Sequence, residues 1–310
     1  MLYFSLMIFN LFQKEVLPPF VTEIIKKRLK REINHSQLTL EDKQFTSYIA
    51  STNKGFLNID VSQNNYQLEI EKAVFSLCQT KNIPIPKIIL YEKMNYSKMP
   101  LFLMIKEMKG KPFAQERMHL FDFNRVLSQL AEILLKLHQN QFSNFGFLNS
   151  DLRAQSSEWH TFLNQTLDEE LRIIYNSQIF SKETRKIIEE NVFFKPEKRK
   201  AVLLHGNIRS SSIYINDNLK ITGLTNFKQP LAGDPHYELA EFLVYDGFDR
   251  AKRLIRRYNS LGGLIEWDSL YFLQISLRRA LMSLSCAINR GQSNLAVRLI
   301  KIITQLVARL

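Results

Sequence analysis

The succession of hydrophobic patterns along the chain most constrains its fold. Three short segments in the first third alternate apolar and polar residues or are rich in β-branched residues, which is typical of strands. They are QLTLE (37–41), QFTSYIAS (44–51) and GFLNIDVS (55–62). Amphipathic patterns typical of helices dominate after residue 120, interrupted by one β-type segment at 202–229. The sequence therefore predicts an α+β protein with a small β-rich lobe and a larger, mostly helical lobe.

The remaining patterns fill in the two lobes. They predict a basic amphipathic helix over 22–32 ahead of the first lobe, and then a helix over 66–81 and strands within 82–92 and 100–113. In the second lobe they predict helices over 121–139, 158–177 and 181–192, the last with Ser181 as N-cap, two short strand pairs in 202–229, and three further helices. We expect an N-terminal helical extension (1–34), a first lobe (35–105) and a helical lobe (106–310).

Composition narrows the class of protein. The two cysteines and six scattered histidines favour neither a disulfide framework nor a zinc site, so a cytoplasmic protein is expected. The apolar start, MLYFSLMIFNLF, is too short to span a bilayer and lacks the features of a signal peptide; a buried helix or a weak membrane or partner contact is expected there.

The net charge of +12 is concentrated near the end of the chain. Residues 250–310 carry eleven Lys and Arg against two acidic residues, Glu266 and Asp268. Either these are solvated helix faces, or they form a surface that attracts a polyanion or an acidic membrane.

An ordered series of motifs resembles the aminoglycoside phosphotransferase family, a branch of the protein-kinase-like fold. The motifs are EIEKAVFSLCQTKNIPIPKIILY, PLFLMIKEMKGKPF, LAEILLKLHQ, LLHGNIRSSSIYI and ITGLTNFKQPLAGDPHYELAEF. The resemblance runs from about residue 35 to about residue 285. It implies a two-lobed kinase-like fold and ATP- and Mg²⁺-dependent phosphoryl transfer. It also implies structural roles for His138 and Asp234, the latter capping and bracing its loop.

The loop that resembles the family's catalytic loop, usually H-G-D-x-x-x-x-N, departs from the pattern. His205 and Gly206 are kept, and His205 is a candidate catalytic residue, but Asn207 stands where the resemblance implies the catalytic aspartate. An amide can orient a hydroxyl but cannot accept its proton as a carboxylate does. Arg209, in the same loop, is a candidate surrogate cation.

The metal-binding positions that the resemblance implies are also changed. Ser212 stands in place of the asparagine ligand, and Asn226 in place of the aspartate ligand. Mg²⁺ prefers charged oxygen ligands. Lys228 is a second candidate surrogate cation, and its positive charge would compete with the metal ion. We therefore expect no metal site.

The first lobe lacks the lysine that the resemblance implies. Glu71 matches the helix glutamate, but the strand 55–62 offers Asn58 or Asp60 at the lysine position, and an Asp60 opposite Glu71 would repel phosphates. The predicted phosphate loop, 40–44, contains no glycine. Met104 and Phe227 are candidates to plug the nucleotide cleft.

These departures lead to one main interpretation and one alternative. The main one is a kinase-like pseudoenzyme that binds an unknown small molecule or protein partner without phosphoryl transfer and needs no cofactor. The alternative is a weakly active phosphotransferase that uses ATP and Mg²⁺ and acts on a neutral or anionic hydroxyl acceptor. A cationic aminoglycoside is disfavoured by the excess of Lys and Arg in the helical lobe.

Overall fold

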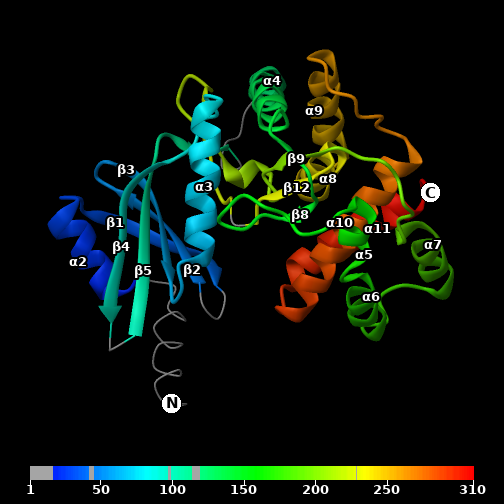
Figure 1. Cartoon of the computed structure of the whole chain (residues 1–310), viewed down its shortest axis with the longest axis horizontal. Coiled ribbons are helices and arrows are strands. Elements are labelled where there is room, and N and C mark those ends of the chain that lie inside the picture. Colours follow the sequence, from blue (N-terminus) through cyan, green and yellow to red (C-terminus); the bar gives the residue numbers. More distant parts are fainter. Residues whose placement is uncertain (1–16, 42–44, 97–98, 114–118, 228) are drawn as a thin grey trace.

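The small lobe is built on one antiparallel sheet. The computed structural model describes residues 17–41, 45–96, 99–113, 119–227 and 229–310. Five strands lie in the order β1-β2-β3-β5-β4. They are β1 (Ile33–Glu41), β2 (Phe45–Thr52), β3 (Gly55–Ser62), β4 (Lys87–Tyr96) and β5 (Met99–Met108). Helices α2 (Pro19–Arg28) and α3 (Tyr66–Thr80) lie on either side of this sheet in Figure 1.

The two faces of the sheet differ because successive side chains of a strand point to opposite sides. On β3, Leu57 and Ile59 are buried in the apolar cluster that contains Val21 and Ile25 of α2. Asp60, their neighbour, lies on the face toward α3 and is also buried. The α2 face is therefore an ordinary apolar core, whereas the α3 face holds buried polar groups.

The helical lobe contains the remaining elements. Its helices are α4 (Leu120–Leu137), α5 (Trp159–Asn164), α6 (Leu167–Asn176), α7 (Lys182–Val192), α8 (Pro235–Asp246), α9 (Phe248–Ser260), α10 (Leu270–Asn289) and α11 (Ser293–Val307). Its short strands are β6 (Lys111–Pro112), β7 (Gln141–Phe142), β8 (Gly146–Phe147), β9 (Ala201–Leu204), β10 (Ile213–Ile215), β11 (Ile221–Leu224) and β12 (Leu231–Gly233). They form two small sheets, β11-β10-β6 and β7-β9-β12-β8. The predicted α+β, two-lobed fold is confirmed.

The chain passes between the lobes after β5. This strand continues to Met108, so the expected lobe boundary at residue 105 falls inside it, and the next strand, β6, pairs with β10 of the helical lobe. Gly110 lies between them with φ +88, and a Cβ there would lie 2.1 Å from the carbonyl oxygen of Ile215. Only glycine fits this close approach, because any side chain would collide with backbone.

Some predicted helix limits need correction. The segment 158–177 forms two helices rather than one, with α6 beginning after Thr166. Four helices rather than three follow residue 234, because Gly247, at φ +89, separates α8 from α9. The basic helix ends at Arg28, since Lys30 adopts a positive φ of 50. Ser181 caps α7 as predicted, accepting the N–H of Thr184 at 3.2 Å.

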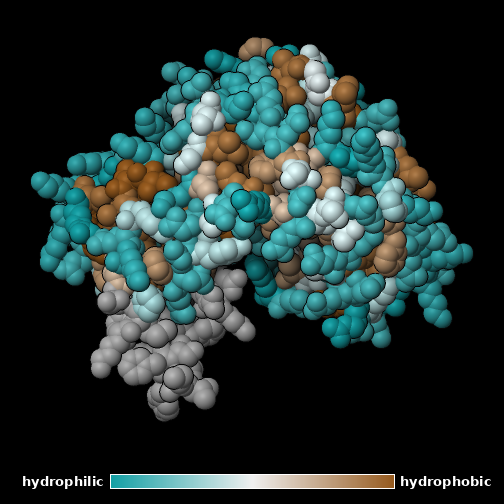
Figure 2. Space-filling view, viewed as in Figure 1, coloured by the Kyte–Doolittle hydropathy of each residue, from teal (hydrophilic) through white to brown (hydrophobic). Residues whose placement is uncertain are grey.

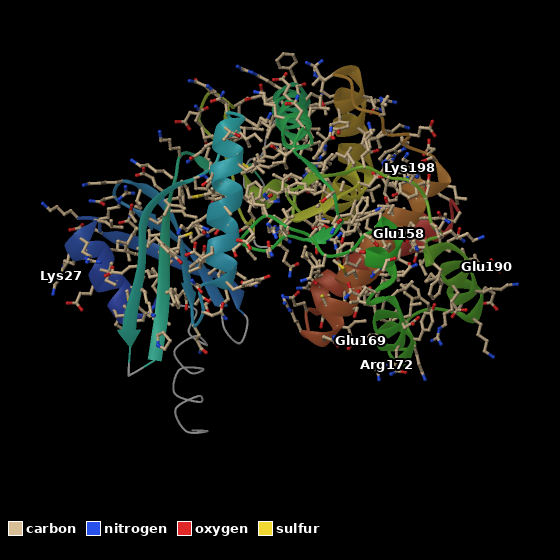
Figure 3. All side chains as sticks on the ribbon, in the orientation of Figure 1. Lys27, Glu158, Glu169, Arg172, Glu190 and Lys198 are labelled. Atoms are coloured by element: carbon tan, nitrogen blue, oxygen red, sulfur yellow. The ribbon has the colours of Figure 1, made fainter. Side chains whose placement is uncertain are left out.

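The charged residues near the end of the chain do not all form a surface. Arg278 and Arg279 of α10 are buried, where they donate to Glu170 and Glu241. They therefore cannot contribute to a polyanion-binding face. Exposed charges elsewhere, such as Arg172 and Glu190, project outward from the rim of the molecule (Figure 3), and the view in Figure 2 is largely hydrophilic.

Within the part of the chain that the structure describes, none of the helices combines the length and apolar character that a membrane crossing needs. The apolar residues 1–12 lie outside the described residues.

Candidate active site

The loop after β9 is held in place by a buried, neutral histidine. His205 is fully buried, and burial lowers its pKa to about 3. Its Nε2 lies 2.8 Å from the carbonyl oxygen of Thr225, and its Nδ1 accepts the N–H of Asn207 at 3.2 Å. A neutral imidazole that donates from Nε2 and accepts at Nδ1 satisfies both contacts. His205, a predicted catalytic residue, thus has both ring nitrogens engaged in shaping the loop.

Glycine is required at the next position. Gly206 has φ +74, and a Cβ there would lie 2.2 Å from the carbonyl oxygen of Gln229. The preserved His205-Gly206 pair thus has a structural reason that is independent of catalysis.

A buried glutamate supports the same loop from α8. Glu238 accepts the backbone N–H of His205. Burial raises the pKa of Glu238 to about 7, although hydrogen bonds from the backbone of His205, Gly206 and Ile208 act in the opposite direction. Glu238 was missed from sequence, although its place in GDPHYELA, four residues after Asp234, was a usable signal.

Asp234 caps α8 as the sequence predicted. Its carboxylate accepts the N–H of His236 at 2.8 Å, and Arg199 lies 3.4 Å from its other oxygen. His236 and Arg199 lower the pKa of Asp234, although burial opposes them. Asp234 is therefore an ionised cap.

His138 is the other predicted structural residue. Its side chain is buried, and its Nδ1 lies 2.7 Å from the hydroxyl of Tyr258.

The predicted base and metal positions carry neutral side chains. Asn207 is half-buried, and its backbone N–H is bound to His205. Ser212 is fully buried in the 3-10 helix η2 (Ser210–Ser212), where its hydroxyl donates to the carbonyl of Arg209 at 2.8 Å and accepts the Arg209 N–H at 3.1 Å. The serine is therefore a local brace of the turn.

The segment after β11 contains Asn226 and Phe227. Asn226 has φ 67, a left-handed conformation that asparagine tolerates better than most residues. Phe227 is buried, with its ring centroid 4.1 Å from that of His205 and 5.8 Å from that of Phe75 on α3. The loop and α3 are thus packed together through Phe227. Lys228 lies outside the described residues.

Two further candidates are engaged by local packing. Arg209 lies with its guanidinium carbon 4.8 Å from the ring centroid of Tyr245, and its positive charge helps to lower the pKa of His205. Met104, on β5, is fully buried against Phe45 and Leu68. Both Met104 and Phe227 are therefore part of packed clusters. Of the predicted phosphate loop, residues 42–44 lie outside the described residues.

The small lobe holds a lysine that the sequence analysis missed. Lys106 of β5 places its Nζ 2.5 Å from Oδ2 of Asp60 and 2.7 Å from Oε2 of Glu71. The expected repulsion of phosphates by Asp60 opposite Glu71 does not take this lysine into account, because its cation lies between the two carboxylates. Burial alone would lower the pKa of Lys106, but Asp60 and Glu71 outweigh it and raise the pKa. No pattern within β5 indicated this partner; only the pairing of β3 with β5 did.

The residues present do not fit Mg²⁺. Among the residues that the structure describes, no group of three or more His, Cys, Asp or Glu could hold a metal ion. Ser212 and Asn226 offer only neutral oxygens, whereas Mg²⁺ is usually bound through carboxylates and phosphates.

Comparisons with known proteins identify the family of the chain. The family model described as "Phosphotransferase enzyme family" matches residues 56–273, and the chain belongs to this family. None of the curated proteins compared with the chain matches it.

Solved structures give the same fold at low sequence identity. Aminoglycoside phosphotransferase APH(4)-Ia, as a thermostable mutant in complex with ADP and hygromycin B, has a TM-score of 0.71 at 15% identity. That match covers 93% of this chain and 98% of the other. The GDP complex of aminoglycoside 2′-phosphotransferase-IIIa has a TM-score of 0.64 at 13% identity, covering 93% and 97%. At such identities the likeness shows the kinase-like fold alone.

Proposed function

We propose that this protein is a pseudoenzyme of the phosphotransferase enzyme family, which binds a ligand or partner and does not transfer a phosphoryl group. One observation carries the proposal: the loop keeps its shape through His205, Glu238 and Ser212, while neutral side chains stand at the base and metal positions. The chain retains the framework of the site without the charges that the reaction needs.

The missing charges affect both the neutralisation of the phosphates and the removal of the proton from the attacking hydroxyl. Phosphoryl transfer in this fold depends on positioning and on electrostatic stabilisation, with metal ions neutralising the phosphates and a carboxylate at the attacking hydroxyl. Asn207 cannot accept the hydroxyl proton. Neutral oxygens at Ser212 and Asn226 leave the phosphate charge unbalanced. Each loss lowers the rate, and together they remove the two main sources of catalysis.

A thermal-shift experiment tests the binding half of this proposal. The wild-type chain is heated with ATP in the presence of Mg²⁺ or of EDTA. We expect the same Tm in both, because the metal has no charged ligand in the protein. A Tm that rises with ATP only when Mg²⁺ is present would contradict the proposal. The matched control is the variant Asn207→Asp/Ser212→Asn/Asn226→Asp, which restores the family's residues and is expected to show a metal-dependent shift.

One observation favours the alternative of a weak phosphotransferase. Lys106 pairs with Glu71, so this lobe does contain a lysine bound to the helix glutamate, although the lysine comes from β5. If this function holds, wild-type protein consumes ATP in the presence of a neutral or anionic alcohol. Asn207→Asp/Asn226→Asp would then raise the rate. Absence of turnover in both proteins, each checked for folding by circular dichroism, would remove this alternative.

The ligand class follows from charge. The chain carries a net charge of +12, which disfavours a cationic acceptor such as an aminoglycoside.

The exposed arginines of α9 remain as a candidate surface for an acidic membrane. They are Arg253, Arg256 and Arg257. Arg253→Glu/Arg256→Glu is expected to abolish sedimentation with phosphatidylserine vesicles. Lys26→Glu/Lys27→Glu on α2 is the control with the same change in charge, and equal loss in both would leave no role specific to α9.

A further inference from the structure

The small lobe holds a buried charge cluster, the triad of Lys106, Asp60 and Glu71. The side chains of all three are at most 2% exposed. They come from β5, β3 and α3, so the triad ties two strands to one helix. The hydroxyl of Ser47 on β2 donates to Oδ1 of Asp60 at 2.6 Å, so β2 is connected to the triad as well.

The arrangement reverses the usual distribution of charge on the sheet. In protein kinases a lysine on the third strand pairs with the helix glutamate and also contacts the nucleotide phosphates. Here the third strand carries Asp60, and the lysine lies one strand away. In the β3–β5 ladder Asp60 is opposite Met104, and Lys106 is opposite Asn58. The ammonium group thus has the helix glutamate as one partner and a second carboxylate, that of Asp60, as the other.

We propose that Asp60 is a built-in anion that occupies Lys106 in place of a nucleotide phosphate. The triad thereby fixes α3 to the sheet without any nucleotide. It follows that a ligand of this lobe is recognised without a phosphate contact to Lys106. The inference deepens the proposed binding function and rests on it for the claim that nucleotide is not needed.

Two physical arguments support this assignment. Lys106 could reach a phosphate only by leaving one carboxylate buried without its cation, and breaking a buried pair in this way is strongly unfavourable. Asp60 is also fixed in place, because Ser47 donates to its second oxygen and the whole group is buried. The pair is therefore a preformed part of the fold that a ligand phosphate would have to displace.

Removing the built-in anion should expose the lysine to phosphate. Asp60→Asn keeps the size of the side chain and an acceptor for Ser47, but leaves Lys106 with Glu71 as its remaining carboxylate in the triad. Binding of inorganic tripolyphosphate is measured by calorimetry in EDTA, which excludes any contribution from a metal. We expect Asp60→Asn to bind at least 10-fold more tightly than wild type. Ser47→Ala, which loses the hydroxyl but keeps the triad, is the matched control and should bind like wild type.

A folded Asp60→Asn protein that binds tripolyphosphate no better than wild type would overturn the inference. A second measurement uses wild-type protein, so it does not depend on the variant folding. Hydrogen exchange of the α3 amides is expected to be slow without nucleotide and unchanged by saturating ATP. Exchange that slows when ATP is added would show that α3 is ordered by nucleotide and not by the triad.

The two proposals can fail separately. If wild-type protein transfers phosphoryl groups with Mg²⁺ and ATP while Asp60→Asn still gains metal-free tripolyphosphate binding, the proposed function falls and the triad inference stands. If wild-type protein is inactive and Asp60→Asn gains nothing, the inference falls and the proposed function stands.

Discussion

The ammonium nitrogen of Lys106 lies 2.7 Å from Oε2 of Glu71, and the two residues are 35 positions apart in the sequence. The contact joins the strand nearest the lobe crossing to the helix that packs on Phe227. One buried ion pair and one aromatic contact therefore link the position of α3 to β5 and to the segment that contains Phe227.

This contact predicts a large stability loss for Lys106→Met. Removing one partner of a buried ion pair costs about 3–5 kcal/mol, because the remaining charge is left without compensation. Unfolding in urea measures the change. The matched control is Lys54→Met, in the exposed turn between β2 and β3, which is expected to change stability by about 0.5 kcal/mol or less. Similar values for the two variants would contradict a structural role for Lys106.

The buried arginines of α10 lead to a second prediction. Arg279 donates to Glu241 of α8 and lies 4.8 Å from the ring centroid of Tyr237. Arg279→Met should lower the free energy of unfolding by about 3–5 kcal/mol, because Glu241 would remain buried without its cation. Arg253→Met, at an exposed position on α9, is the control, with an expected change of about 0.5 kcal/mol or less. If both substitutions lower the free energy of unfolding by the same small amount, Arg279 does not stabilise the fold through its contact with Glu241.

The third prediction concerns Gly206. A Cβ at this position would collide with the carbonyl oxygen of Gln229, so Gly206→Ala must displace backbone as well as adopt a positive φ. Gly291 also has a positive φ, of 64, but a Cβ there would have nothing within 4 Å. Gly291→Ala should cost about 1 kcal/mol from backbone strain alone. Gly206→Ala should cost at least twice as much in thermal unfolding, and equal costs would show that the loop yields easily.

The fourth prediction is acid sensitivity. Burial lowers the pKa of His138, as it does that of His205, to about 3, so the folded protein keeps both neutral. Below pH 6.5 the unfolded chain takes up protons that the folded chain does not. Each histidine should therefore lower the unfolding free energy by about 2–3 kcal/mol between pH 6.5 and 4.5. The carboxyl of Glu238 has the opposite effect. Because burial raises its pKa to about 7, it increases the unfolding free energy as the pH falls from 7 to 4.5.

Comparing variants isolates the histidine contribution. His138→Asn retains a polar group that can contact the hydroxyl of Tyr258 and does not titrate in this range. Its unfolding free energy should fall by about 2–3 kcal/mol less than that of wild type between pH 6.5 and 4.5. His35→Asn, at an exposed position of β1, is the control and should follow wild type. Parallel curves for His138→Asn and wild type would show that His138 is protonated in the folded state.

Much of the site could be predicted because its residues are close in sequence. His205, Gly206 and Ser212 lie in one loop, and Asp234 begins the helix that follows, so motif spacing was enough to place them. The cap at Ser181 is likewise a local feature, and the structure confirms it. The helix limits near Thr166 and Gly247 were missed because apolar residues continue on both sides of each.

The sequence by itself determined the two-lobed fold, much of the order of the elements, and the neutral residues at the predicted base and metal positions. These depend on periodicity and on motifs within a few residues of one another. The tertiary structure decided which charges meet. Lys106 joins Asp60 and Glu71, and Arg279 joins Glu241, only because strand pairing and helix packing bring distant segments together. A charge on a single segment does not indicate whether it will face water or a buried partner, since that depends on the surface packed against it.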